Sequence, residues 1–142
     1  MTMVVRSLVG RYATKIIQLL TPKTAVPWLS VADTVRDAFD HLETYELGAS
    51  PMLDRTGRYV GTVTDADLRR YVANTIDHDA ALATPLGQIE RRSRNAAVTV
   101  DREVDSVVDL ASLHRFVPVI DNAGRLLGIV DRRRILETRL PA

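Results

Sequence analysis

Apolar positions recur along the chain at two spacings, and these spacings predict the order of helices and strands. Near the N-terminus the spacing is helical, which predicts an amphipathic helix within residues 1–20. It should end at Thr21-Pro22, because proline cannot continue a helix. Its apolar face comprises Val5, Leu8, Val9, Tyr12, Ile16, Leu19 and Leu20. Charged residues and a glycine interrupt it well before the roughly 20 apolar residues of a membrane span. We therefore expect no membrane association.

Two later stretches share one residue pattern. Residues 50–63 return as residues 117–130, with five identities at a constant offset of 67. The identical pairs are Pro51 and Pro118, Asp54 and Asp121, Gly57 and Gly124, Gly61 and Gly128, and Val63 and Val130. A recurring pattern of this kind indicates a duplicated structural unit.

Both copies predict the order β-α-β-β-α. In copy one we expect strands at 25–31, 51–53 and 59–63, and a final helix at 66–73. In copy two the strands should be 97–100, 118–120 and 126–130, and the final helix 132–140. The apolar faces of the first helices are Val35, Ala38, Phe39 and Leu42 in copy one, and Val104, Val107, Val108 and Ala111 in copy two.

Short polar residues mark where these elements begin and turn. Asp33 and Asp101 precede the two first helices and are expected to be their N-caps. Gly57 and Gly124 should form the hairpin turns, where a positive φ is required.

The region between the copies predicts a linker, residues 75–96. Thr84 as N-cap and Pro85 at the first helical position predict a short helix over 86–92. We interpret Asp77-His78-Asp79 as a solvated loop rather than a metal site, because a third ligand is missing.

The chain thus divides into an N-terminal helix (1–20), a first repeat (21–74), the linker and a second repeat (97–142). The fold class is α/β (α+β), with the two repeats related by a pseudo-two-fold axis.

The composition limits the kinds of chemical site that the chain can form. The formal net charge is +1, there is no cysteine, and the three histidines are widely spaced. Disulfides, thiolate metal sites and a cysteine nucleophile are excluded, no metal site is expected, and a cytoplasmic location is expected. No catalytic motif is found, so we expect no catalytic residues. The basic clusters Arg91-Arg92-Ser93-Arg94 and Arg132-Arg133-Arg134 leave nucleic-acid binding as a less favoured alternative.

The doubled pattern resembles a pair of CBS domains, also called a Bateman module, over roughly residues 15–140. The residues that carry the resemblance are 51–68 and 117–131, with their shared Pro, Asp and Gly positions. The resemblance implies a module that binds an adenosine nucleotide (AMP, ADP, ATP or cyclic di-AMP) in the cleft between the repeats. The family's phosphate-ribose motif, Gly-x-x-Thr/Ser-x-x-Asp/Asn, is intact as Gly61, Thr64 and Asp67.

The chemistry of the motif fits this ligand. Thr64 stands where a strand gives way to a helix, and helix N-termini attract anions. Asp67 follows three residues later on the same face, and an ionised carboxylate can accept two ribose hydroxyls. The alternative is that Thr64 or Asp65 is an ordinary cap with no ligand.

Copy two departs from the motif, with Asp131 at the threonine position and Arg134 at the aspartate position. Arg132 and Arg133 could bind a phosphate there, or form exposed ion pairs with Asp131, Glu137 or a neighbouring subunit. The layout is also similar to that of small stand-alone CBS proteins that bind cyclic di-AMP. That similarity adds Lys23, Thr24, Ala25 and Val26 to the expected binding residues, the last two through an edge of backbone facing the adenine.

The resulting prediction is a non-enzymatic regulatory module that needs no cofactor, senses an adenosine nucleotide and signals to a protein partner. By family analogy it should form a homodimer. The main alternative is a ligand-free dimerisation module, for which the available apolar residues are Trp28, Leu29, Phe39, Tyr45, Phe116 and Val117. Their spacing places most of them in the core instead.

Overall fold

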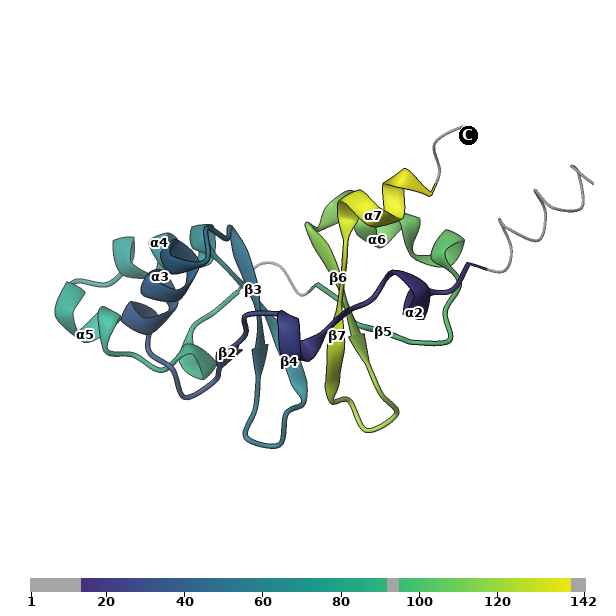
Figure 1. Ribbon diagram of the computed structural model, residues 1–142. Coiled ribbons are helices and arrows are strands. Elements are labelled where there is room, and N and C mark those ends of the chain that lie inside the picture. The colour runs from purple at the N-terminus through teal and green to yellow at the C-terminus, as the bar shows by residue number, and fades with distance from the viewer. Residues whose placement is uncertain (1–13, 92–94, 139–142) are drawn as a thin grey trace, which may run out of the picture. The chain divides into compact units, whose positions relative to one another are not determined.

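The structure is a computed structural model that describes residues 14–91 and 95–138. The chain divides into two compact units (Figure 1). Unit 1 comprises Met1–Val26, Ala96–Ala123 and Leu127–Ala142. Unit 2 comprises Pro27–Asn95 and Gly124–Leu126.

Unit 2 contains a three-stranded sheet in the order β2-β3-β4. Its strands are β2 (Leu29–Ser30), β3 (Ala49–Leu53) and β4 (Tyr59–Thr64). β2 runs parallel to β3, and β3 pairs with β4 as an antiparallel hairpin. The helical elements are α3 (Val35–Thr44), α4 (Asp65–Ala73), α5 (His78–Leu82) and the 3-10 turn η2 (Leu86–Gln88). α3 and α4 pack side by side (Figure 1).

The core of unit 2 joins the sheet to these helices. Its buried residues are Leu29, Val35, Ala38, Leu42, Met52, Val63, Leu68, Leu86 and Ile89. Three of the four residues expected on the apolar face of the first helix are among them, and Phe39 packs against the cluster while partly buried. The helical spacing therefore predicted this face correctly.

Unit 1 contains a four-stranded sheet in the order β1-β7-β6-β5. Its strands are β1 (Thr21–Pro22), β5 (Val98–Thr99), β6 (Phe116–Ile120) and β7 (Leu126–Asp131). The helical elements are α2 (Ile16–Leu19), η1 (Lys23–Ala25), η3 (Val104–Val107), α6 (Val108–Leu113) and α7 (Arg132–Glu137). The core residues include Val104, Val107 and Ala111 of the expected helical face, with Val108 packed against them.

Both hairpin turns form as the glycines indicated. Gly57 and Gly124 each have a φ of 84°. In the first turn the Asp54 carboxylate accepts hydrogen bonds from the Thr56 hydroxyl (2.7 Å) and the Arg58 N–H (3.0 Å). The Thr56 hydroxyl bond is the main reason that the pKa of Asp54 lies below its usual value.

The predicted N-cap of α3 was wrong by one residue. Thr34, not Asp33, is the N-cap, and its Oγ1 accepts the Asp37 N–H at 3.1 Å. The Asp37 carboxylate in turn accepts the Thr34 N–H at 2.9 Å, which completes a capping box. Asp33 instead accepts the Ser30 N–H at 2.8 Å within the preceding turn.

The corresponding prediction in copy two was also wrong. The helical region starts with η3, whose N-cap position is Glu103 and carries no side-chain bond. Asp101 accepts the Thr99 hydroxyl at 2.5 Å, and this bond lowers the pKa of Asp101. The expected continuous helix is split between η3 and α6, since helical geometry changes at Val107.

Several element boundaries differ from the sequence prediction. The first strands of the copies shrink to two residues each, β2 and β5, and residue 25 of the first predicted strand belongs to the turn η1 instead. α4 begins at Asp65 rather than at residue 66, and α7 ends at Glu137 within the described residues. Residues 139–140 of the predicted last helix lie outside them, as do residues 1–13 of the predicted N-terminal helix.

The linker is more ordered than the sequence suggested at one end and less helical at the other. The expected loop at 77–79 opens helix α5, and the Asp77 carboxylate accepts the Ala80 N–H at 3.2 Å. The expected helix over 86–92 is only the turn η2, with Pro85 rather than Thr84 at the N-cap position. The Thr84 carbonyl accepts the Val35 N–H instead, at 3.0 Å. Arg92 lies outside the described residues.

Candidate functional site

The junction of β4 and α4 in unit 2 holds two of the three motif residues in a reciprocal cap. Thr64 is the N-cap of α4, in an extended conformation. Its Oγ1 accepts the Asp67 N–H at 3.0 Å, and Asp67 Oδ2 accepts the Thr64 N–H at 3.3 Å. Thr64, and not Asp65, therefore caps α4.

Asp67 is an unusual capping residue because it is buried. Only 2% of its surface is exposed, whereas Asp37 in the corresponding box of α3 is exposed. Asp67 Oδ1 accepts a hydrogen bond from Arg70 Nη1 at 3.0 Å, and the two form an ion pair. A carboxylate is tolerated at such depth only with charged and hydrogen-bonding partners of this kind.

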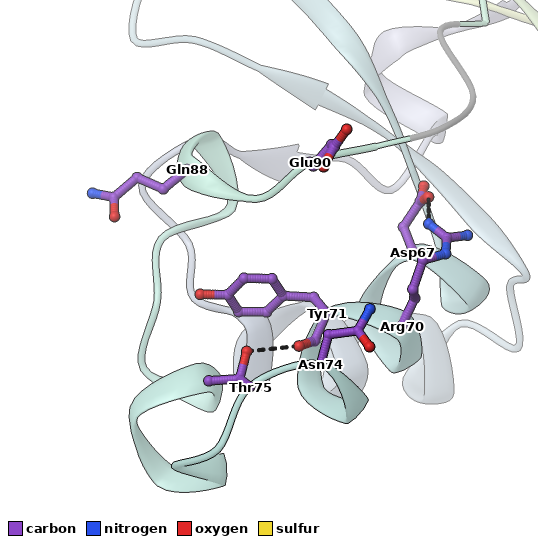
Figure 2. Close-up of a pocket in the computed structure, with 7 residues that line it drawn as sticks. All are labelled: Asp67, Arg70, Tyr71, Asn74, Thr75, Gln88 and Glu90. Carbon is purple, nitrogen blue, oxygen red and sulfur yellow. Dashed lines mark hydrogen bonds and ion pairs between the residues drawn. The ribbon is translucent and has the colours of Figure 1, made fainter.

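Asp67 also lines a pocket, which we call the α4 pocket (Figure 2). The pocket has a volume of about 430 Å³, and α4 and the segment after it form one wall, opposite Gln88 and Glu90. Its lining residues are Asp67, Arg70, Tyr71, Asn74, Thr75, Gln88 and Glu90. The joined side chains of Asp67 and Arg70 stand at one side, and the Tyr71 ring lies in the middle (Figure 2). The Tyr71 hydroxyl donates to Thr84 Oγ1 at 3.1 Å, which fixes the ring.

A second pocket in unit 2, the Gly61 pocket, has a volume of about 460 Å³. Its lining residues are Tyr59, Val60, Gly61, Ile89, Glu90 and Arg91. The Tyr59 hydroxyl donates to the Asn95 carbonyl at 2.6 Å and lies 2.7 Å from Thr62 Oγ1. Burial raises the pKa of Tyr59 to about 12, so its phenol stays neutral at physiological pH.

The motif residues are thus only partly brought together. Asp67 lines the α4 pocket, Gly61 lines the Gly61 pocket, and Thr64 lines neither. Glu90 belongs to both linings, so the two pockets share one wall residue.

The remaining predicted site residues belong to unit 1. Lys23, Thr24 and Ala25 form the turn η1, and the Val26 N–H donates to the Lys23 carbonyl at 3.1 Å. That N–H is therefore already used, and Val26 itself is buried. An adenine edge would have to be met by other backbone groups of this segment.

The junction of β7 and α7 in unit 1 differs from the β4–α4 junction. Asp131 is the N-cap of α7 but makes no side-chain capping bond. Arg134 Nη1 donates to the Leu19 carbonyl at 2.9 Å. Arg132 and Arg133 are exposed, and the ion pairs expected with Asp131 or Glu137 are not formed within the described part of the chain.

Sequence reasoning missed most of the pocket walls. Arg70 could have been found, since it lies three residues after Asp67 on the same helix face. Glu90 and Arg91 gave no local signal, because they reach the pockets only through the path of the linker.

In residues 14–91 and 95–138, no three or more acidic or histidine side chains lie together so that they could hold a metal ion. None of the helices described is long and apolar enough to cross a membrane.

Comparison with known proteins decides the family. Residues 16–74 and 87–140 both match the CBS domain. The chain belongs to the CBS domain family.

Two relatives match most of this chain. An uncharacterized 17.7 kDa protein of Acidianus ambivalens is 29% identical over 130 residues, which are 90% of this chain and 74% of that protein. The inosine-5'-monophosphate dehydrogenase of Methanocaldococcus jannaschii is 26% identical over 119 residues, 78% of this chain but only 21% of the enzyme. The enzyme relative therefore matches over its CBS portion and not over the whole enzyme.

The solved structures share the fold. CBSX2 in complex with AMP has a TM-score of 0.74 and 22% identity, covering 89% of this chain and 96% of that chain. CbpB in complex with c-di-AMP has a TM-score of 0.85 and 16% identity, covering 98% of this chain and 93% of that chain. Two CBS repeats in a mixed α/β fold are thus established for this protein.

Proposed function

We propose that this CBS pair is a non-catalytic regulatory module that binds an adenosine nucleotide (AMP, ADP, ATP or cyclic di-AMP) at the β4–α4 junction. The observation that carries the proposal is Asp67, a buried carboxylate of the intact motif that lines a pocket of about 430 Å³. That volume lies within the range of small-molecule sites.

The groups at the junction suit a phosphorylated ribose. The Asp67 carboxylate has lone pairs for ribose hydroxyls, once Arg70 shares or leaves Oδ1. The Thr64 hydroxyl accepts the Asp67 N–H and keeps its own hydrogen to donate to a phosphate. The N-terminus of the nine-residue helix α4 adds a favourable field for an anion. The Tyr71 ring offers a flat face to a ring of the ligand.

Family membership supports the choice of an adenine ligand, because structures with the same fold hold AMP and c-di-AMP. A second set of residues, expected from the sequence, belongs to the same proposal. It comprises Lys23, Thr24, Ala25 and Val26 at η1, with Arg132 and Arg133 at the start of α7.

We further propose a homodimer that acts on a protein partner. Exposed apolar side chains are available in both units, with Trp28 at 42%, Tyr45 at 54% and Leu113 at 74% exposure. Leu29, Phe116 and Val117 are buried and cannot serve this purpose.

One observation favours the alternative, a dimerisation module without a ligand. Thr64 and Asp67 satisfy each other in a complete capping box, so the fold requires no ligand at this point. The same box on α3, formed by Thr34 and Asp37, supplies a matched control.

A thermal-shift panel separates the two functions. It would contain AMP, ADP, ATP, cyclic di-AMP and GMP, with the wild type, Asp67→Asn and Asp37→Asn. A ligand at 100 times its Kd stabilises by about 2.7 kcal/mol, which raises the Tm by several degrees. We expect an adenine ligand to shift the wild type and Asp37→Asn but not Asp67→Asn. No shift with any adenine ligand would overturn the proposal and favour the ligand-free module.

A further inference from the structure

Arg91 lines the Gly61 pocket and has no ion-pair partner among the residues that the structure describes. Its guanidinium lies against the backbone of Gly61, where a Cβ would collide with Nη1. Nη1 is buried and has no hydrogen-bond partner among the residues described. Arg91 Nη2 donates to the Val60 carbonyl at 3.3 Å, a long bond.

Within residues 14–91 and 95–138, no carboxylate forms an ion pair with this guanidinium. The three ion pairs formed in the described part of the chain involve Lys15, Arg69 and Arg70, not Arg91. Glu90 lines the same pocket but is exposed and forms no ion pair with its neighbour in the described structure. A guanidinium nitrogen left buried and unbonded is unfavourable, so an incoming anion would gain from pairing with it.

Rotating the Arg91 guanidinium toward the inside of the pocket would cost few hydrogen bonds. Because Nη1 bonds to nothing described, a rotation of the side chain breaks only the long bond from Nη2 to Val60. The pocket of about 460 Å³ has room for a phosphate group. The Tyr59 hydroxyl cannot compete for this role, since it already donates to the Asn95 carbonyl.

We infer that Arg91 binds a phosphate group of the ligand in the Gly61 pocket and makes the site select phosphorylated ligands over the bare nucleoside. The inference rests on the proposed function, because it assigns the anionic end of the same ligand. A guanidinium forms two parallel hydrogen bonds with a phosphate, whereas the motif residues Gly61, Thr64 and Asp67 carry no positive charge.

The backbone conformation explains why position 61 is a glycine. Gly61 has a φ of 147°, which residues with a side chain rarely adopt, whereas the Arg91 guanidinium beside it is the movable end of a long side chain. Glu90 opposes the phosphate, but it is exposed and screened by solvent. Glu90→Gln should therefore strengthen phosphate binding modestly.

The test compares AMP with adenosine by isothermal titration calorimetry in the wild type, Arg91→Gln, Arg91→Lys and Arg69→Gln. Arg69 is the matched control, an exposed arginine of α4 that pairs with Asp65 and lines neither pocket. We expect Arg91→Gln to raise the Kd for AMP about tenfold or more and to leave that for adenosine within about twofold. Arg91→Lys should recover part of the loss, and Arg69→Gln should bind both like the wild type.

Inorganic pyrophosphate serves as a second probe, followed by ³¹P NMR in the same variants. Pyrophosphate binding that is lost in Arg91→Gln supports the inference, even if no adenine ligand binds and the proposed function fails. Equal wild-type affinities for AMP and adenosine would overturn the inference and leave the proposed function standing. An AMP affinity that is unchanged in Arg91→Gln, or falls together with that for adenosine, would also overturn it. So would a wild type that binds neither AMP nor pyrophosphate.

Discussion

The β4–α4 and β7–α7 junctions occupy the same place in the two repeats, yet only the first has the features of a binding site. At β4–α4 the threonine and aspartate close a capping box, and the aspartate is buried beside a pocket. At β7–α7 the equivalent residues are Asp131, which caps with no side-chain bond, and the exposed Arg134. At both junctions the strand ends at an extended N-cap residue and the helix begins at the next residue. The scaffold therefore depends on the shared apolar and glycine positions, and the chemistry on two polar positions.

Exchanging the charges at these positions should give the largest effect on stability. Asp67→Arg places a second guanidinium beside Arg70 at a position that is 2% exposed, so we expect a loss of about 3 kcal/mol or more in the free energy of unfolding. The reverse change, Arg134→Asp, removes one exposed hydrogen bond and should lose less than about 1 kcal/mol. Urea denaturation of both variants measures the difference. Similar losses would mean that the two junctions are not energetically distinct.

The sequence predicted the scaffold well where local rules decide the outcome. Gly57 and Gly124 adopt the positive φ that a tight hairpin turn requires, and the spacing of Val35, Ala38 and Leu42 gave the buried face of α3. The cap of α3 was misplaced because Asp33 and Thr34 are both good caps, and only the tertiary turn that engages Asp33 with Ser30 separates them.

The two pockets could not be predicted from the sequence, for a different reason. Their walls combine α4 or β4 with the linker, and Glu90 and Arg91 carry no motif that would place them there. The motif singled out Asp67 as a candidate, but it did not indicate the ion pair between Asp67 and Arg70.

Removing the capping side chain should lower the free energy of unfolding by less than the charge exchange does. Thr64→Ala breaks the bond that satisfies the Asp67 N–H, which typically destabilises by about 1 kcal/mol. Asp131→Ala removes no capping bond and should change the free energy of unfolding by less than about 0.5 kcal/mol. Parallel thermal and urea unfolding of the two alanine variants tests this. A loss in Asp131→Ala as large as that in Thr64→Ala would contradict the contrast.

A third difference between the repeats concerns pH. His41 Nε2 lies 3.0 Å from Ser50 Oγ, whereas the repeat offsets put Leu110 and Val117 at the matching positions in copy two. Burial lowers the pKa of His41 below 6.5, and the nearby negative charge of Asp33 opposes this only in part.

The folded protein therefore favours the neutral imidazole. Its contribution to stability is fully present above pH 6.5 and declines as the pH falls through the lowered pKa. We expect the Tm to decrease between pH 7 and pH 5, and His41→Leu combined with Ser50→Val to reduce that decrease. His78→Gln, at an exposed histidine, is the control and should keep the wild-type profile. An unchanged profile in the double variant would remove His41 as the cause.

The central claim is that the intact junction, and not the altered one, binds an adenosine nucleotide. The most direct measurement is calorimetric titration with the adenine ligand that gives the largest thermal shift, on the wild type, Asp67→Asn and Arg134→Gln. The account predicts saturable binding to the wild type and to Arg134→Gln, and a loss of at least about tenfold in affinity for Asp67→Asn. Full affinity in Asp67→Asn, with a loss in Arg134→Gln, would contradict it and move the site to the β7–α7 junction.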